Sequence, residues 1–484
     1  MSQVLLPPDS PPTALRPLCV DLDGTLVKSD TLIDSLLLLM RKRPALLLKL
    51  PLILIRGKAA FKAYVTSHVS LDVAFLPYNR KLLQFLQEQR RLGRPIYLAT
   101  GANESLARRA AAHLGLFTDV LGSDGTTNLT GNKKLDGLRA RLGSAAFDYI
   151  GNDTPDLPLL AHATEAMVAN PSVALRLKLR SGKIQPVRRF EERPQPLHSA
   201  LKALRPHQWA KNLLVFLPLL LSHVVTARLL LQALLAFCCF SLTASSAYIV
   251  NDLLDIEADR RHPQKRLRPF ASGDLPAITG VLIVTVFLGL AFLGARLLPA
   301  AFLAWLLLYV VTTLLYSWHL KSIALVDVLV LSGLYTLRLL AGAAATGAHI
   351  SHWLAGFSIF LFFSLAIVKR FAELENLQAS ALPPRNGRGY VVADLNQLRS
   401  FGTASAFAAV MVFAIYISNP EIVALYRRPQ LLWLGVPLMI LWLCRIWLLA
   451  SRGSLDEDPL VFALTDRMSQ LIAIAVAVVT VLAI

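Results

Sequence analysis

Apolar and polar positions are distributed differently in the two halves of the chain. Through residues 1–180, charged and polar residues recur throughout, and short apolar stretches alternate with helix-like segments. From about residue 206 onward, long apolar runs follow one another with few charges inside them. This contrast predicts a water-exposed domain followed by a bundle of membrane helices.

Three short apolar stretches in the first half have the pattern of strands that end in polar residues. They are PLCVDLDG (17–24), RPIYLATGAN (94–103) and FDYIGNDTPD (147–156), with helical patterns between them. Strands that alternate with helices form a parallel sheet, whose ligands bind at the carboxyl ends of the strands. We therefore predict an α/β domain over residues 1–180, with its functional site at these strand ends.

The stretch TLIDSLLLLMRKRPALLLKLPLILIRG (31–57) is nearly as apolar as a membrane span. RKRP divides it into pieces that are too short to cross a bilayer. We predict a helical cap on the α/β domain, or a helix that lies on the membrane surface.

A basic, proline-containing linker is predicted at 181–205, and an all-α transmembrane domain at 206–484. Hydropathy indicates about nine spans in this second domain. They centre near 213–225, 229–250, 276–297, 300–318, 323–346, 353–368, 401–418, 431–450 and 468–484.

The charge of the chain fits this membrane assignment. The 484 residues are 55% hydrophobic and carry a net charge of +18. Cytoplasmic loops of membrane proteins hold an excess of Lys and Arg, so the charge does not indicate a nucleic-acid partner. The connections 252–275 and 369–400 are both rich in Lys and Arg. They predict a multi-pass protein of the bacterial inner or plasma membrane, with its N-terminal domain and the acidic segment near residue 252 in the cytoplasm.

The segment YIVNDLLDIEADRRHPQKRLRPFASG (248–273) follows an apolar run long enough to span a membrane, and it contains a cluster of acidic residues followed by a cluster of basic residues. Asp252, Asp255 and Asp259 are spaced i, i+3, i+7, with Asn251 beside them, so a helix would place the three carboxylates on one face. Their repulsion requires a cation, and Mg²⁺ typically bridges carboxylates to substrate phosphates. The cations that could bind the outer phosphate oxygens are Lys265, Arg266 and Arg268. The alternative is a solvated helix end with snorkelling charges, which three aligned acids and a basic loop disfavour.

A second polar group follows the fourth span, in YSWHLKSIALVD. It contains Tyr316, Lys321 and Asp327, and Arg338 lies within the next span. Ionisable residues inside a membrane indicate function, although Asp327 and Arg338 could simply pair with each other.

The N-terminal strand ends carry their own chemistry. Asp21 and Asp23 of VDLDGT could act as nucleophile and general acid/base, and both could bind a metal. The hydroxyl of Thr100 could hold phosphate, and Lys134, with Lys133 as the alternative, could neutralise the phosphoryl charge. The Mg²⁺ candidates at the third strand end are Asp153 and Asp156.

The order of these motifs resembles the haloacid dehalogenase (HAD) phosphatases, whose fold is a Rossmannoid sheet with a helical cap. The resemblance covers about residues 1–180. One departure is Asn152 of GNDTPD, at the place where the family usually has an aspartate. A degenerate domain kept for regulation or stability is the alternative.

The segment NDLLDIEAD resembles the first aspartate motif of the UbiA superfamily of intramembrane prenyltransferases. Residues 200–484 look closest to the polyprenyl-phosphate phosphoribosyltransferases of the decaprenyl-phosphate type. The supporting segments are RPHQWAKN (205–212), the acidic and basic run above, YSWHLKSIALVD followed by RLLAGA, AIVKRFAEL (366–374) and DEDPLVFALTDR (456–467).

The resemblance implies a helical bundle whose acidic motifs hold Mg²⁺ and a diphosphate. Asn251, Asp252, Asp255 and Asp259 would bind the metal. A second acidic motif is incomplete, because Asp327 is followed four residues later by Leu331. Additional substrate-binding residues would be Lys211, Tyr316, Lys321, Arg338, Lys369 and Arg370.

The predicted function is Mg²⁺-dependent transfer of 5-phosphoribosyl from phosphoribosyl pyrophosphate to a polyprenyl phosphate, with a HAD domain that removes the product's phosphate. The alternative is an aromatic prenyltransferase of the quinone or haem type, which uses a prenyl diphosphate and carries an unrelated or inactive phosphatase. A transporter or scaffold without catalysis is disfavoured by the intact acidic motifs.

Overall fold

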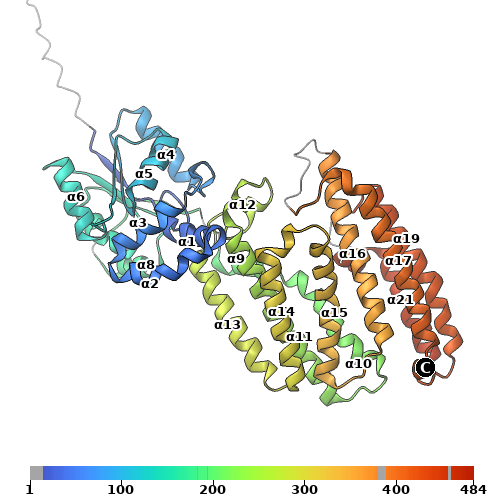
Figure 1. The fold of residues 1–484 in the computed structure, drawn as a ribbon. Helices are drawn as coiled ribbons and strands as arrows, with labels where there is room; N and C mark the ends of the chain where they lie inside the picture. The colour runs from blue at the N-terminus through green and yellow to red at the C-terminus, as the bar shows by residue number, and fades with distance from the viewer. Residues whose placement is uncertain (1–14, 183, 193, 380–387, 456–458) are drawn as a thin grey trace, which may run out of the picture. The chain divides into compact units, whose positions relative to one another are not determined.

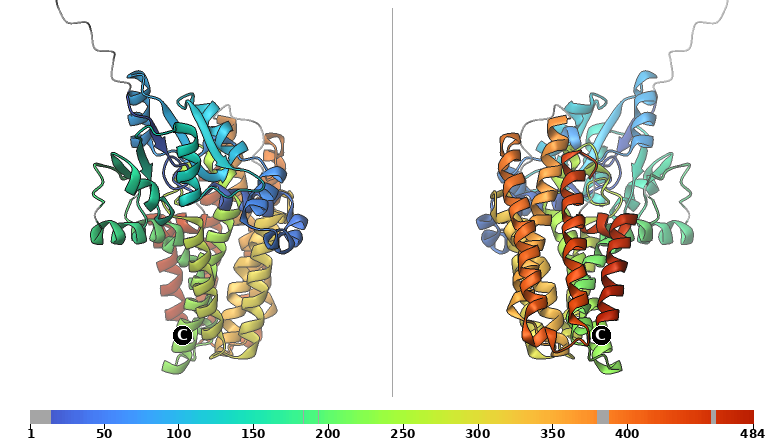
Figure 2. Two further views of the ribbon diagram at one scale, coloured as in Figure 1. Left: turned by 90° about the vertical axis from the view of Figure 1, so that its left-hand side faces the viewer. Right: turned by 90° about the vertical axis from the view of Figure 1, so that its right-hand side faces the viewer.

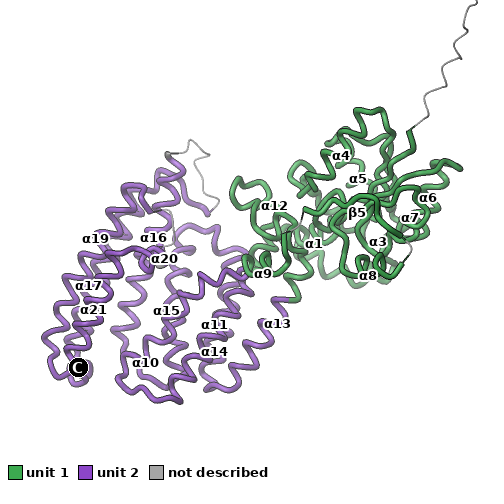
Figure 3. Tube along the Cα trace, turned by 180° about the vertical axis from the view of Figure 1, so that it is seen from behind, with its two compact units in different colours: residues 1–203, 249–282 green, residues 204–248, 283–484 purple. Residues whose placement is uncertain are grey.

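The computed structural model describes residues 15–182, 184–192, 194–379, 388–455 and 459–484. They form two compact units, shown in Figure 3. The N-terminal unit comprises 1–203 with 249–282, and the C-terminal unit comprises 204–248 with 283–484. The acidic segment therefore belongs by its contacts to the N-terminal unit. Residues 456–458, which begin the DEDPLVFALTDR segment, lie outside the described residues.

A six-stranded parallel sheet with the order β3-β2-β1-β4-β5-β6 organises the N-terminal unit (Figure 1). The predicted parallel α/β fold is confirmed. Arg188–Phe190 forms the edge strand β6, so part of the stretch predicted as a linker belongs to the sheet. The other strands are β1 Leu18–Val20, β2 Ile96–Asn103, β3 Asp119–Ser123, β4 Asp148–Gly151 and β5 Ala166–Ala169.

Alternation along the strands gives the sheet an apolar core on each face. Leu18 and Val20 of β1 join one core cluster, while Cys19 between them joins the other. Successive side chains of a strand point to opposite faces, so helices are needed on both sides. The helices of this part are α1 Thr31–Lys42, α2 Leu50–Ile55, α3 Lys58–His68, α4 Arg80–Arg91, α5 Glu104–Leu114, α6 Asn132–Leu142, α7 Leu157–His162, α8 Val173–Ser181 and α9 Pro196–Leu204.

The second half of the chain is helical, as predicted, and its long helices run alongside one another (Figure 2). Seven helices in the described residues are long and apolar enough to cross a membrane. Two of the predicted spans, at 213–225 and 468–484, are not among these seven helices. The first is the end of a 3₁₀ segment (206–216) plus the short helix α10, and the second is a shorter apolar helix, α21. The helices are α10 Leu217–Leu221, α11 Ala227–Leu254, α12 Ile256–Arg261, α13 Ala277–Ala295, α14 Ala300–Trp318, α15 Val326–Thr346, α16 His352–Ala379, α17 Leu395–Ser418, α18 Pro420–Val423, α19 Gly435–Ser451, α20 Pro459–Thr465 and α21 Arg467–Ala483.

Helix α15 lies in the middle of the C-terminal unit. It packs against α14, α16 and the 3₁₀ segment at 206–216. Gly342 permits the last of these contacts, because a Cβ atom there would lie 2.1 Å from the carbonyl oxygen of Val215. The same helix buries the side chains of Asp327 and Arg338, so it carries polar groups into the interior of the bundle.

A buried ion pair seats the acidic segment on helix α1 within the N-terminal unit. Arg260 of α12 lies 2.8 Å from the carboxylate of Asp34, and both side chains are almost fully buried. The same guanidinium donates hydrogen bonds to the hydroxyl of Ser29 (3.0 Å) and the carbonyl of Ala271 (3.1 Å). Each charge therefore has a partner, which a buried charge requires.

We expect Asp34→Ala to lower the free energy of unfolding by about 3–5 kcal/mol, because Arg260 would be left buried without its counter-charge. The double variant Asp34→Leu/Arg260→Met, which removes both charges, should recover most of this loss. Thermal unfolding of the purified protein in detergent measures both effects. A double variant as unstable as Asp34→Ala would contradict the explanation by charge pairing.

Candidate functional site

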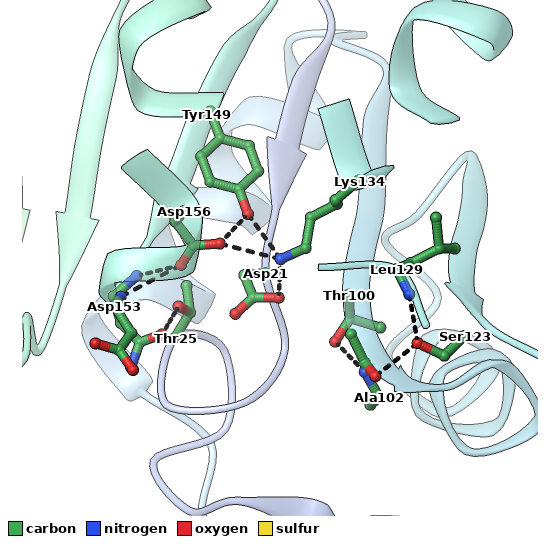
Figure 4. Close-up of polar contacts among 12 residues, drawn as sticks. Asp21, Thr25, Thr100, Ala102, Ser123, Leu129, Lys134, Tyr149, Asp153 and Asp156 are labelled. Atoms are coloured by element: carbon green, nitrogen blue, oxygen red, sulfur yellow. Dashed lines mark hydrogen bonds and ion pairs between the residues drawn. The ribbon is translucent and has the colours of Figure 1, made fainter. Parts of the chain in front are cut away.

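The first polar cluster lies at the carboxyl ends of β1 and β4 in the N-terminal unit (Figure 4). Asp21 follows β1 directly, and its backbone N–H donates to the carbonyl of Ile150 on β4 (3.0 Å). The chain then turns at Gly24, which has a φ of +74° that favours glycine. Asp23 accepts a hydrogen bond from the backbone N–H of Thr31 (2.8 Å), at the start of α1. The turn thus places two carboxylates two residues apart at one strand end.

Lys134 connects the carboxylates of two strand ends. Its ammonium lies 2.9 Å from Asp21 and 3.0 Å from Asp156, and it donates to the hydroxyl of Tyr149 (3.1 Å). Tyr149 in turn donates to Asp156 (2.7 Å). All four side chains are buried. The structure therefore selects Lys134 over the exposed Lys133 as the lysine of this cluster. It also adds Tyr149, whose only signal in the sequence is its place in a predicted strand.

Burial sets the proton affinities in this cluster. It raises the pKa of Asp21 to about 6, against the opposing effect of Lys134. Burial, with Asp30 nearby, raises the pKa of Asp23 to about 8. Asp156 behaves differently, since Lys134, Tyr149 and backbone N–H groups more than offset burial and lower its pKa. A pair of acids with different proton affinities suits a nucleophile that is ionised beside a protonated general acid.

Asp153 and Asp156, the residues predicted as Mg²⁺ candidates, follow the end of β4. Asp156 accepts hydrogen bonds from the backbone N–H groups of Asn152 (3.0 Å) and Asp153 (3.3 Å) in addition to its bonds with Lys134 and Tyr149. The exposed Asp153 accepts from Ser172 (2.7 Å) and from the backbone of Thr154 (2.7 Å). The side chain of Asn152 accepts a hydrogen bond from Thr25 of the β1 turn (3.2 Å). The side chain of Asn152, directly after β4, thus contacts the loop that carries Asp21 and Asp23.

Two further residues line the cavity beside this cluster. Thr100, within β2, is buried and accepts a hydrogen bond from the backbone N–H of Ala102 (3.0 Å). Lys62 of α3 donates to the carbonyl of Gly101 and to Asn128, and burial lowers its pKa. Lys62 was not predicted from the sequence, and it lies beyond the stretch 31–57 that was predicted as a cap. The oxygens of Asp21, Asp23 and Asn152 are hard donors, so the chemistry of the set fits Mg²⁺.

The acidic segment forms a second cluster, built around Arg268. One nitrogen of its guanidinium lies 3.1 Å from Asp252 and 2.7 Å from Asp259. Helical hydrogen bonding continues across the junction of α11 and α12, from Asp255 to Asn251 and from Asp259 to Asp255. This continuity explains why acids seven residues apart reach the same cation. Burial raises the pKa of Asp259, and Arg268 opposes that rise.

The remaining predicted residues of this segment lie around the central pair. Asp255 is 3.8 Å from Arg41 of α1, and Asn251 is half-buried beside Asp252. Lys265 and Arg266 are exposed on the loop that leads to Arg268. The donors are all oxygens, which fits Mg²⁺, and the arginine supplies positive charge between two of them.

Asp327 is the centre of a third cluster, in the C-terminal unit. Its carboxylate pairs with Arg370 of α16, accepts a hydrogen bond from the hydroxyl of Tyr316 (2.7 Å) and lies 3.5 Å from Arg388. Arg370 also pairs with Glu373 (2.7 Å). Asp327 was predicted as a metal ligand, and the structure surrounds it with cations. Lys321 and Lys369 are half-buried.

Arg338 belongs to a fourth cluster, because it does not pair with Asp327. Its guanidinium donates to Asn212 (2.8 Å) and to the hydroxyl of Tyr309 (3.0 Å), and it lies over the ring of Tyr335. The ammonium of Lys211 lies over the same ring, 5.7 Å from its centre. Within the described residues, no three His, Cys, Asp or Glu side chains are grouped as a complete metal site.

Comparison with known proteins identifies two parts of the chain. Residues 213–467 match the model of the UbiA prenyltransferase family, and residues 18–161 match that of haloacid dehalogenase-like hydrolases. The uncharacterized protein y4nM of Sinorhizobium fredii is 36% identical over 95% of this chain and 90% of its own length. A decaprenyl-phosphate phosphoribosyltransferase of Mycobacterium tuberculosis is 32% identical over 57% of this chain and 90% of its own length. The solved structure of a UbiA homolog from Archaeoglobus fulgidus, bound to DMAPP and Mg²⁺, is 20% identical, with a TM-score of 0.45 over 58% of this chain and 99% of that one.

The Lys134 cluster makes stability depend on pH in a defined direction. We expect Lys134→Met to leave Asp21 and Asp156 buried without their cation, so that the raised pKa of Asp21 rises further and the pKa of Asp156 rises above its unfolded value. A carboxyl group whose pKa is raised in the folded state makes a contribution to stability that is fully present at low pH. This contribution is lost as the pH increases through the folded pKa. The loss relative to the natural protein should be small near pH 4 and reach about 3–5 kcal/mol at pH 7.

Thermal unfolding from pH 4 to pH 8 measures this difference. Lys133→Met is the matched control, since that neighbouring lysine is exposed. A loss of stability in Lys134→Met that is equal at all pH values would show that the lysine does not balance these carboxylates.

Proposed function

Because the chain belongs to the UbiA prenyltransferase family and carries a HAD-like hydrolase domain, we propose that it transfers 5-phosphoribosyl from phosphoribosyl pyrophosphate to a polyprenyl phosphate. The observation that carries the proposal is the Asp252–Arg268–Asp259 cluster, within a region similar to decaprenyl-phosphate phosphoribosyltransferases. It combines oxygen ligands with a cation that suits a diphosphate. The second step of the proposal is removal of the 5-phosphate from the lipid product by the HAD domain.

The transferase chemistry follows from the charges of the acidic segment. Asn251, Asp252, Asp255 and Asp259 would hold Mg²⁺, which would neutralise charge on the leaving pyrophosphate when bound. Arg268 lies between two of these acids and can bind phosphate oxygens, as can the exposed Lys265 and Arg266. An oxygen of the polyprenyl phosphate then forms a bond to C1 of the ribose as the bond from C1 to pyrophosphate breaks.

Asp327 and Arg370 would serve the same reaction in a different manner. The carboxylate is already paired with arginine, so this cluster would contribute positive charge to substrate phosphates, not a second metal. Tyr316, Lys321 and Lys369 are proposed as further substrate contacts, and so is Arg338 of the separate cluster with Asn212 and Tyr309.

The phosphatase step would use the acids at the end of β1. An oxygen of Asp21 attacks phosphorus while the bond to the C5 oxygen of the ribose breaks, and Asp23 gives its proton to that oxygen. Water then attacks the aspartyl phosphate, Asp23 accepts the water's proton, and inorganic phosphate leaves. Lys134 neutralises charge on the phosphoryl group, which is the role its position beside Asp21 supports.

The chain is an integral membrane protein, and we place the HAD domain and the acidic segment on the cytoplasmic side. Basic connections support this side by the positive-inside rule. The segment 44–55 also supports a membrane-surface position, because it exposes Leu48, Leu52 and Ile55 beside Lys49 and Arg56.

We expect Asp252→Ala to lower phosphoribosyl transfer by about 10²–10³-fold, since charge on the departing pyrophosphate would lose its stabilisation. The measurement uses purified protein, Mg²⁺ and radiolabelled phosphoribosyl pyrophosphate, with and without decaprenyl phosphate, and counts label in the organic phase. Glu421→Ala, which changes an exposed acid of the C-terminal unit, is the control. If the natural protein transfers no label but consumes prenyl diphosphate with an aromatic acceptor, the aromatic prenyltransferase assignment replaces ours.

Asp21→Asn should separate the two steps, because it removes the phosphatase nucleophile and leaves the acidic segment intact. We expect the lipid product to keep its 5-phosphate, with at least about a 10²-fold loss of phosphate release. Phosphate analysis of the labelled lipid measures the outcome, and Asp136→Asn, at an exposed position of α6, is the control. Accumulation of the dephosphorylated lipid in Asp21→Asn would refute the second step.

A further inference from the structure

The cavity at the phosphatase cluster has walls of two different chemical kinds. Its volume is about 370 Å³. One part of the lining is polar and includes Asp21 and Asp23, after β1, and Lys134 of α6. The other part of the lining is mostly apolar and comes mainly from α12, the loop after it and the start of α13: Ile256, Phe270, Leu275, Pro276, Ala277 and Ile278. Binding of a phosphate group alone does not require apolar residues, since cations and N–H donors bind its oxygens.

The apolar wall is fixed in place by close packing within the N-terminal unit. Phe270 is 2% exposed, and a Cβ atom on Gly280 would lie 2.7 Å from its ring. Gly273 approaches Lys28 so closely that a Cβ atom would lie 2.7 Å from the Cβ of the lysine. The next residue, Asp274, pairs with that lysine at 3.1 Å. Together with the buried Arg260–Asp34 pair, these contacts hold the apolar residues in a fixed position beside the cavity.

The wall continues into a helix with the properties of a membrane span. Ala277 and Ile278 line the cavity and are the first residues of α13, which is long and apolar enough to cross a bilayer. Ile278, Leu282, Val286 and Leu290 are all about half exposed or more. Their spacing of four residues places them on one side of the helix. An apolar stripe therefore begins inside the phosphatase cavity and follows the helix.

We propose that the cavity is specific for a phosphomonoester carried on a membrane lipid, and that Ile278 with its neighbours binds the first apolar part of that lipid. The inference rests on the proposed function and narrows it. The polar wall takes the phosphate and the sugar, while the lipid chain leaves along the stripe of α13. Hydrolysis breaks the bond between phosphorus and the C5 oxygen with water, and it releases inorganic phosphate and the lipid-linked alcohol.

The test compares two phosphomonoesters with the same sugar phosphate. The full-length protein in phosphatidylcholine nanodiscs is given either ribose 5-phosphate or synthetic farnesyl-phosphoryl-ribose 5-phosphate, and phosphate release gives kcat/KM for each. We expect kcat/KM to be at least about tenfold higher for the lipid ester, which corresponds to about 1.4 kcal/mol of apolar contact. Equal values for the two esters would overturn the inference.

Variants then locate the contact. Ile278→Ser should reduce the ratio of the two kcat/KM values about tenfold, and the side chain is exposed enough that folding should tolerate the change. Val311→Ser changes a similarly exposed, β-branched residue on another span, α14, and should leave the ratio as it is in the natural protein. Equal effects of the two substitutions on the ratio would also overturn the inference.

A second pair of variants tests the seating of the wall. Gly273→Ala should lower the ratio, because the added methyl group would collide with Lys28. Gly93→Ala introduces similar backbone strain, at a φ of +78°, but has no atom within 4 Å of the new methyl group. Because the lipid ester is supplied ready-made, these results do not depend on phosphoribosyl transfer. If no radiolabel from phosphoribosyl pyrophosphate reaches the lipid but the ratio of the two kcat/KM values is as expected, the transferase step alone is rejected.

Discussion

The structure depends on one electrostatic constraint: a buried carboxylate that stays ionised needs a cation within hydrogen-bonding distance. A carboxylate removed from water loses its hydration, and only a nearby positive charge with good geometry restores most of that energy. Lys134 serves Asp21 and Asp156, Arg260 serves Asp34, and Arg370 serves Asp327. Arg268 does the same for Asp252 and Asp259. Structural and candidate functional positions follow the same rule, so the pairing alone does not distinguish them.

The pairing also explains why this chain can carry phosphate chemistry at several places. An arginine or lysine that balances an acid is held in position before any substrate arrives, so a phosphate meets a prearranged donor. Arg268 and Lys134 have this arrangement beside polar cavities or exposed basic loops, whereas Arg260 is enclosed by protein groups that satisfy it. The first two are therefore suited to binding, and Arg260 is suited to joining segments.

The boundaries of the two compact units do not coincide with the boundaries of the two family matches. The family match to UbiA begins at residue 213 and includes the acidic segment, yet the contacts of 249–282 assign that segment to the unit of the HAD-like domain. Ion pairs such as Arg260–Asp34 and Lys28–Asp274, and the close approach at Gly273, account for this assignment. One segment thus carries the predicted metal ligands of the transferase and one wall of the phosphatase cavity.

The sequence by itself determined the parallel α/β fold, the helical membrane half and the acids at the strand ends, because periodicity and strand-end chemistry are local properties. It also identified Asp252 and Asp259 as neighbours, since helical spacing is local. It could not show that Asn152 is the residue that contacts Thr25 in the turn after β1. Nor could it show that Arg370 pairs with Asp327, or that Arg338 donates a hydrogen bond to Asn212. Those contacts join residues far apart in the chain, so only the tertiary packing decided them. The apolar wall at Phe270 and Ile278 was decided in the same way, because nothing in its local pattern shows which surface it faces.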